Sequence, residues 1–126
     1  MMKSISPNIF VKDIHATIAF YEQLGFKEVN RVPDKGEPVW VMMVLGEVTF
    51  MFQTMESLGQ DLPAISRRSG GSLLLYIQVE GIREFFEKIK DHATVIKGLE
   101  KTFYGATEFS IQDPNGYVLT FAEDEA

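Results

Sequence analysis

The stretch VKDIHATIAFYEQLGF, residues 11–26, decides how this chain folds. Its apolar side chains recur at the spacing of one helical face, namely Ile14, Ile18, Tyr21 and Leu24. Asp13 precedes them and is the expected N-cap, while Gly25 is the expected end of the helix. The pattern therefore predicts an amphipathic helix near the start of the chain.

The same arrangement returns in the second half of the chain. The segment GIREFFEKIK, residues 81–90, has apolar residues at helical spacing. VKDI at residue 11 recurs as VEGI at residue 79, 68 residues later, and GEV at residue 46 matches GYV at residue 116, 70 residues later. Two matches at nearly the same offset indicate an internal duplication.

Segments with strand composition surround both helices. They are SISPNIFVK (4–12), FKEVNRVP (26–33), PVWVMMVLG (38–46), EVTFMFQ (47–53), SLLLYIQVE (72–80), ATVIKG (93–98), ATEFSIQD (106–113) and YVLTFAED (117–124). Each half thus reads βαβββ. We predict an α+β fold in which two such modules form a curved, mostly antiparallel mixed sheet around a cavity. The expected organisation is a single domain, 1–126, with modules at about 1–55 and 71–126 and a link at 56–70.

Composition limits the possible functions. With 126 residues, 45% of them apolar, the chain suits one domain with a real core. It has no cysteine and no run near the roughly 20 apolar residues of a membrane helix, so we expect a cytoplasmic protein that binds no membrane. The net charge of -6 disfavours nucleic acid and suits a cationic small molecule.

Strand alternation predicts which side chains face the cavity. Leu73, Leu75, Ile77 and Val79 form an apolar row expected beneath the second helix, as do Phe109, Ile111, Leu119 and Phe121. The opposite face then holds Asn8, Leu74, Tyr76, Glu108, Ser110 and Thr120, and the internal repeat adds Trp40, Met42 and Phe50. These aromatic side chains line a ligand pocket, fill the space between the halves, or form a dimer interface. The polar groups among them favour the pocket.

These features together resemble one known group of proteins. The duplicated βαβββ unit, the stretch at 11–26, the ending EFSIQDPNGYVLTF and the pair Tyr104-Gly105 resemble the vicinal oxygen chelate superfamily. It groups glyoxalase I, bleomycin resistance proteins, fosfomycin resistance enzymes and ring-cleaving dioxygenases. The resemblance implies that metal-dependent members place their ligands where this chain has Ser6, Leu74 and Thr120. These side chains are poor ligands for a divalent ion, so we expect no metal and no cofactor.

The chain's two histidines do not offer replacement ligands. His15 falls in the first turn of the first helix, and His92 follows the second helix, so both are expected on the surface. Among metal-free members, the bleomycin resistance proteins resemble the chain in Pro7, in EVTFMF, in the DP.G ending and in the acidic tail AEDEA.

That resemblance implies a homodimer that sequesters a flat cationic drug without transforming it. Here the aromatic side chains expected to stack on such a ligand are Trp40, Phe50, Phe52, Tyr76 and Tyr104, with Glu108 meeting the positive group. Our leading hypothesis is thus a metal-free protein that binds a small aromatic or cationic molecule, with no catalytic residue assigned.

Two alternatives remain open at this point. One is an enzyme of the same superfamily. It would be a metal-dependent lyase, isomerase or dioxygenase-like enzyme that uses Gln53 or Glu47 in a shifted register, or a metal-free enzyme with Glu108 as general base. The other is a structural or regulatory module whose open face is covered by a partner protein. No glycine-rich phosphate loop or nucleophile motif is present in the sequence.

Overall fold

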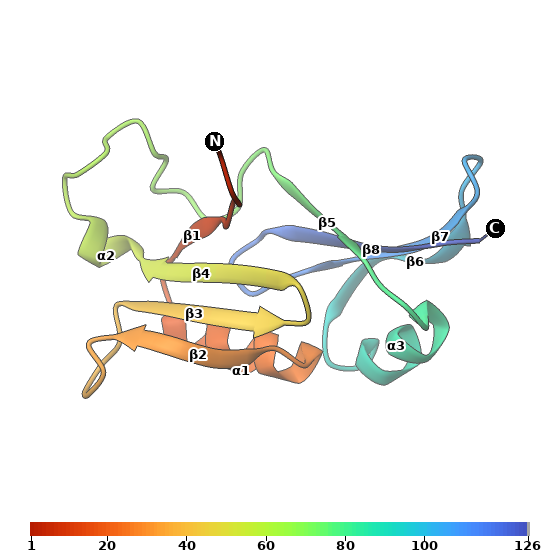
Figure 1. Ribbon diagram of the computed structural model, residues 1–126, viewed down its shortest axis with the longest axis horizontal. Coiled ribbons are helices and arrows are strands. Elements are labelled where there is room, and N and C mark those ends of the chain that lie inside the picture. Colours follow the sequence, from red (N-terminus) through yellow and green to blue (C-terminus); the bar gives the residue numbers. More distant parts are fainter. Residues whose placement is uncertain (126) are drawn as a thin grey trace. The chain divides into compact units, whose positions relative to one another are not determined.

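The computed structural model describes residues 1–125 and divides the chain into two compact units, Met1–Ser69 and Gly70–Ala126 (Figure 1). In the first unit the elements are β1 (Asn8–Val11), α1 (Ile14–Leu24), β2 (Lys27–Val32), β3 (Trp40–Leu45), β4 (Val48–Thr54) and α2 (Met55–Leu58). In the second they are β5 (Leu74–Gln78), α3 (Ile82–Ile89), β6 (Thr94–Lys101), β7 (Ala106–Gln112) and β8 (Val118–Asp124).

The two units repeat one topology. The strand order is β1-β4-β3-β2 in the first sheet and β5-β8-β7-β6 in the second, and each sheet has one parallel pair, β1 with β4 and β5 with β8. This confirms the α+β fold of two βαβββ modules. Within residues 1–125, no helix is both long and apolar enough to span a membrane. That the modules form a single domain stays a prediction.

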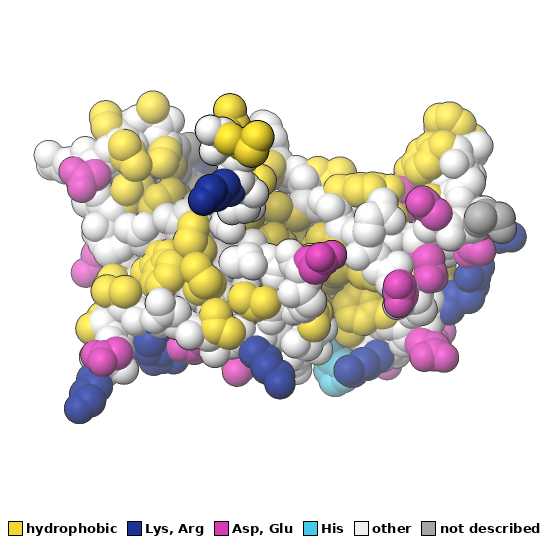
Figure 2. All heavy atoms as spheres, in the orientation of Figure 1, with side chains coloured by type: hydrophobic (Ala, Val, Ile, Leu, Met, Phe, Trp, Pro, Cys, Tyr) yellow, Lys and Arg dark blue, Asp and Glu magenta, His cyan; other side chains and the backbone are white. Residues whose placement is uncertain are grey.

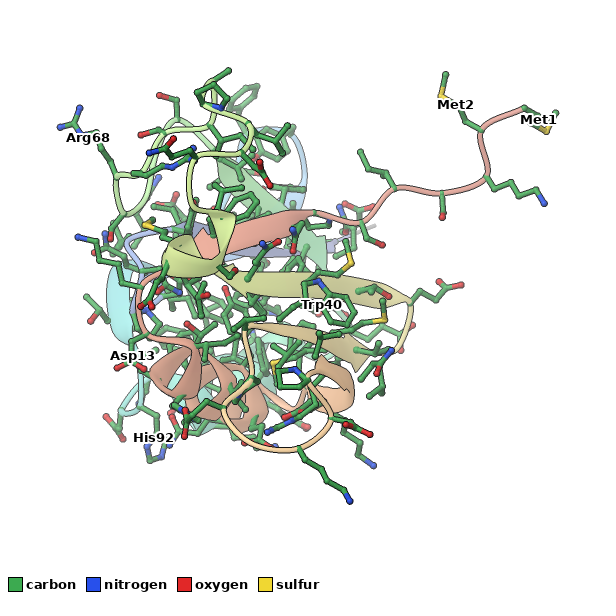
Figure 3. The ribbon with its side chains drawn as sticks, turned by 90° about the vertical axis from the view of Figure 1, so that its left-hand side faces the viewer. Met1, Met2, Asp13, Trp40, Arg68 and His92 are labelled. Carbon is green, nitrogen blue, oxygen red and sulfur yellow. The ribbon has the colours of Figure 1, made fainter. Side chains whose placement is uncertain are left out.

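The first helix begins and ends where the sequence predicts. The Asp13 side chain accepts a hydrogen bond from the Ala16 N–H at 3.0 Å, and Gly25 ends α1 with a left-handed φ of 109° (Figure 3). The buried face of α1 centres on Tyr21, whose ring lies 4.7 Å from that of Phe52 and 5.6 Å from that of Phe50. Aromatic packing therefore joins this helix to the first sheet.

The predicted link at 56–70 contains structure that the sequence pattern did not reveal. It begins with the short helix α2 and continues as a loop wrapped around Arg67. The Arg67 guanidinium donates to four backbone carbonyls, those of Leu62 (3.0 Å), Ile65 (2.6 Å), Gly59 (2.8 Å) and Asp61 (2.7 Å). A planar guanidinium with several donors can satisfy such a ring of acceptors, so Arg67 fixes the loop.

The N-terminus of helix α3 is capped by a side chain from a distant part of the chain. Its N-cap residue is Gly81, which has no side chain, and Glu123 of β8 accepts hydrogen bonds from the N–H groups of Gly81 (3.0 Å) and Ile82 (3.1 Å). Glu125 accepts from the Thr107 hydroxyl and forms an ion pair with Arg83 at 2.8 Å. The hydrogen bond from Thr107, followed by that from Arg83, lowers the pKa of Glu125. Part of the acidic tail is therefore structural.

The predicted hairpin near the end of the chain is a five-residue loop between β7 and β8. The Asp113 carboxylate accepts hydrogen bonds from the N–H groups of Asn115 and Tyr117, both at 2.9 Å. Gly116 has a φ of 86°, and a Cβ on Gly70 would lie 3.0 Å from the Gly116 carbonyl oxygen. Gly70 also has a positive φ, 76°, so backbone conformation favours glycine at both positions, and close approach leaves no room for a side chain at Gly70.

The predicted placement of Phe50 on the open face is wrong, and Phe52, which was expected to stack on a ligand, does not lie on that face either. Both are buried beneath α1, with exposures of 4% and 0%, because β4 presents them on the same side as Val41 and Met43. The register pairs Met42 with Met51 in the first unit and Ser110 with Thr120 in the second, so Met51 is the counterpart of Thr120. The shared glycines misled the alignment of the halves, because the first hairpin turns in two residues and the second in five.

A smaller correction concerns Leu73. It was expected in the buried row of the fifth strand, but β5 begins one residue later and Leu73 is 48% exposed. The rest of that row, Leu75, Ile77 and Val79, is half-buried. Phe109, Ile111, Leu119 and Phe121 are buried as predicted.

Candidate functional site

A hollow of about 230 Å³ lies on the second sheet, on the face that turns away from α3. Phe85 and Phe86 of α3 pack against Phe109 and Phe121 on the other face. The residues that line the hollow are Leu74, Tyr76, Lys97, Glu100, Tyr104, Glu108, Ser110 and Thr120, together with Phe109, whose ring packs against α3 on the other face. It therefore combines two phenols, two carboxylates, one ammonium group and apolar surface.

Strand register brings the floor of this hollow together. Tyr76 of β5 lies beside Thr120 of β8, which lies beside Ser110 of β7. The Ser110 and Thr120 hydroxyls form a buried hydrogen bond at 2.8 Å. The two polar groups thus satisfy each other, which is what a buried hydroxyl requires.

Two tyrosines hold the carboxylate of Glu108. The hydroxyls of Tyr76 and Tyr104 both donate to its Oε2 atom, each at 2.5 Å. These hydrogen bonds raise the pKa of both tyrosines, and burial of the hydroxyls adds to the effect. Within residues 1–125, no group donates a hydrogen bond to the other oxygen, Oε1. Glu108 is therefore fixed by one oxygen and offers the other as an acceptor.

Tyr104 reaches the hollow from the turn between β6 and β7. The Gly105 N–H bonds to the Thr102 carbonyl at 3.3 Å, and Gly105 has a φ of 87°. Phe103 in the same turn is fully exposed and packs edge-on against Tyr104 at 5.1 Å. Figure 2 shows hydrophobic side chains gathered at this hairpin tip. Tyr76 and Tyr104 are themselves about half-exposed, at 47% and 57%, so their rings remain accessible to a ligand.

Lys97 and Glu100 complete the hollow, and sequence reasoning missed both. Lys97 pairs with Ser110 and Glu100 pairs with Glu108, so an advance of three residues along β6 matches an advance of only two along β7. This β-bulge puts both charged side chains on one face, where they pair at 2.8 Å. The hydrogen bond to Glu100 is the main reason that the pKa of Lys97 is raised. The only sequence signal was Gly98, since glycine inside a strand often marks a bulge.

Six of the eleven predicted ligand residues meet in this hollow, namely Leu74, Tyr76, Tyr104, Glu108, Ser110 and Thr120. Trp40 (Figure 3) and Met42 alternate with the buried Val41 and Met43, so they lie on the face of the first sheet that turns away from α1. Asn8 lies on that face too and donates to Gln53 Oε1 at 2.9 Å. Phe50 and Phe52 lie beneath α1. Ligand binding by any of these residues stays a prediction.

Comparison with known proteins gives the family. Residues 4–121 match the sequence profile of the Glyoxalase/Bleomycin resistance protein/Dioxygenase superfamily. The chain belongs to this superfamily. No curated protein matches the chain significantly.

Several solved structures share the fold. A glyoxalase/bleomycin resistance protein/dioxygenase family enzyme from Burkholderia phytofirmans PsJN is 27% identical, with a TM-score of 0.76 over 94% of this chain and 96% of that one. The bleomycin resistance determinant encoded on transposon Tn5 is 23% identical, with a TM-score of 0.71 over 99% and 100%. TioX from Micromonospora sp. ML1 is 16% identical, with a TM-score of 0.78 over 98% and 99%.

The residues of the hollow do not fit the divalent metal that some members of the superfamily use. Two of the three expected ligand positions, Leu74 and Thr120, lie here and supply an alkyl group and a hydroxyl that is already hydrogen-bonded. Among residues 1–125, no three His, Cys, Asp or Glu side chains gather as a metal-binding group.

Neither the histidines nor the alternative ligands line the hollow. His15 and His92 are both exposed, and His15 pairs with Glu37 at 2.5 Å. Gln53 is bonded to Asn8 and to the Ser57 hydroxyl, the latter at 3.1 Å, while Glu47 lies in an exposed turn of the first unit. The side chains of the hollow are suited to a ligand bound by hydrogen bonds, charge and ring contacts.

Proposed function

We propose that the hollow of the second unit binds a small organic cation with an aromatic body, and that the protein sequesters this molecule without a metal or other cofactor. The observation that carries the proposal is Glu108, whose Oε2 is held by two phenols and whose Oε1 accepts no hydrogen bond from residues 1–125. A carboxylate held in this way is pre-organised, so a ligand ammonium group can bond to it without first ordering the side chain.

The surroundings of Glu108 favour the same class of ligand. Two carboxylates against one ammonium group leave the hollow with a net negative charge. The half-exposed rings of Tyr76 and Tyr104, together with Leu74 at 52% exposure, offer surface for an aromatic body. Tyrosine rings also attract cations that lie over their faces. The volume of about 230 Å³ suits a ligand of one or two rings.

The proposal extends to assembly and location. We propose that the protein is a homodimer, on the basis of the family resemblance. We also propose that it is cytoplasmic, because its sequence has no cysteine. The Tn5 bleomycin resistance determinant shares the fold, which is compatible with a role in antibiotic sequestration. At 23% identity that likeness identifies no ligand for this chain.

A matched set of ligands tests the proposal. 2-Naphthylmethylammonium, 2-naphthylmethanol and 2-naphthylacetate share one aromatic body and differ in charge. Isothermal titration calorimetry should show that the ammonium compound binds at least about tenfold more tightly than the alcohol, because a charge-assisted hydrogen bond contributes about 1.5–3 kcal/mol. In Glu108→Gln the two affinities should become similar.

The control is Glu84→Gln, which removes a carboxylate from the exposed surface of α3 and leaves the hollow intact. It should retain the wild-type preference for the ammonium compound. Equal binding of all three compounds to the wild type would refute the charge recognition, and no binding of any of them would refute the site.

The same carboxylate also supports a second candidate, a metal-free enzyme with Glu108 as general base. The available Oε1 atom is the feature that favours it, since a base must reach the proton that it removes. Mass spectrometry of the bound compounds after long incubation separates the two roles. Unaltered ligand supports sequestration, whereas a product that forms with the wild type and not with Glu108→Gln supports catalysis.

A further inference from the structure

The ion pair between Lys97 and Glu100 has a geometry that an ordinary surface pair on a strand does not have. Side chains three residues apart on a regular strand point to opposite faces. Here β6 is irregular between Val95 and Lys97 and again between Lys97 and Glu100, and the result places both charges on the face of the hollow. Bulges of this kind re-aim side chains next to functional sites.

The pair lies where it can influence Glu108. Glu100 is the neighbour of Glu108 across the strands, and both line the hollow with Lys97. Lys97 has two carboxylates within reach of its charge, and it bonds to Glu100 at 2.8 Å. Among residues 1–125, Lys97 forms an ion pair with Glu100 and none with Glu108.

We infer that the Lys97–Glu100 pair sets the charge selectivity of the hollow, with Glu100 restraining a lysine that would otherwise compete with a cationic ligand for Glu108. Lys97 is a specificity-determining residue in this scheme, and Glu100 acts through it as a positioning residue. The inference rests on the proposed function, because it concerns ligands of the same site. It adds that charge selectivity depends on Lys97 and Glu100 as well as on Glu108, the carboxylate that contacts the ligand.

Binding of the naphthyl series to two variants tests this inference. Lys97→Met removes the competitor, so 2-naphthylmethylammonium should bind about three- to tenfold more tightly and 2-naphthylacetate more weakly. Glu100→Gln releases Lys97, so the ammonium compound should bind more weakly and the acetate more tightly. The uncharged 2-naphthylmethanol should bind equally to both. Each change should shrink as salt is added, because the groups are partly exposed.

Charge-matched controls separate a local effect from the net charge of the protein. Lys101→Met removes a lysine from the same strand outside the hollow, and Glu84→Gln removes a carboxylate from α3. Both should leave the three affinities within about a factor of two of the wild type. In the Lys97→Met background, Glu100→Gln should weaken ammonium binding less than it does alone, since no lysine remains to be released.

A measurement without ligand tests the same coupling. Lys97 and Tyr104 both line the hollow, and the nearby positive charge of Lys97 favours a tyrosinate, so alkaline absorbance titration of the tyrosines should move to higher pH in Lys97→Met. It should move to lower pH in Glu100→Gln. Differences measured against Tyr104→Phe assign the shift to the hollow.

The outcomes distinguish this inference from the proposed function. If the ammonium compound binds the wild type but neither variant differs from its control, the selectivity role is refuted and the binding site stands. If no compound binds the wild type, the proposed function fails, and opposite tyrosine shifts would still support the restraint of Lys97. If neither the affinities of the charged compounds nor the tyrosine titrations move in either variant, the inference is refuted.

Discussion

Replacing Glu123 with alanine should destabilise the second unit by about 2 kcal/mol. Its carboxylate accepts hydrogen bonds from the N–H groups of Gly81 and Ile82 at 3.0 and 3.1 Å, and the cap position of α3 itself has no side chain to take its place. Loss of a helix cap costs about 1 kcal/mol, and loss of a negative charge at a helix N-terminus costs about 0.3–1 kcal/mol more. Ile82 is fully buried, so water cannot readily replace the hydrogen bond that its N–H loses. The unsatisfied N–H therefore increases the loss of stability.

The assay is urea unfolding followed by far-ultraviolet circular dichroism. Glu123→Gln keeps one acceptor oxygen without the charge, so it should lose about half as much stability as Glu123→Ala. The control is Asp124→Asn, an exposed neighbour with no hydrogen bond to its side chain within residues 1–125. If Glu123→Ala and Asp124→Asn unfold at the same urea concentration, the carboxylate does not cap α3 and the reasoning fails.

Three further predictions follow from the fold and the hollow. Phe50→Ala should lower the free energy of unfolding by about 3–5 kcal/mol, because it leaves a cavity in the aromatic core beneath α1. Met51→Ala, on the opposite face of the sheet, should lower it clearly less. The reverse order in urea unfolding would show that the strand register is wrong. The hydrogen bond to Glu108 raises the pKa of Tyr76. The wild type should therefore lose stability as the pH rises above about 10, where tyrosines of the unfolded chain ionise, and Glu108→Gln should lose less stability. Equal losses in alkaline unfolding experiments would contradict this. Arg67→Lys should speed proteolytic cleavage between residues 55 and 69, since an ammonium group has only three donors for the four carbonyls. Cleavage at the wild-type rate would mean that Arg67 does not fix the loop.

Local patterns were sufficient to predict most of the fold. Helix α1 could be predicted from its cap and from the spacing of its apolar face, and both are observed. The error at Phe50 came from aligning the halves on glycines in turns of different length, which moved one strand by a single residue and so to the wrong face. The alternation of Phe50 and Phe52 with Thr49, Met51 and Gln53 contained the correct answer, because the polar residues mark the open face.

The site could be predicted only where it follows regular strands. Tyr76 and Glu108 were found because side chains alternate along β5 and β7. Lys97 and Glu100 were missed because a bulge breaks that alternation, and periodicity cannot locate a bulge. The Glu123 side chain caps α3 through Gly81 and Ile82, which precede it in the sequence by 42 and 41 residues. No local sequence pattern indicates a contact at that separation.

A crystal structure of the protein with 2-naphthylmethylammonium tests the central claim most directly. We expect the ammonium nitrogen about 2.7–2.9 Å from Glu108 Oε1, with the naphthyl ring against Tyr76 and Tyr104. A ligand bound away from Glu108, or a divalent metal ion coordinated by its carboxylate, would contradict the account.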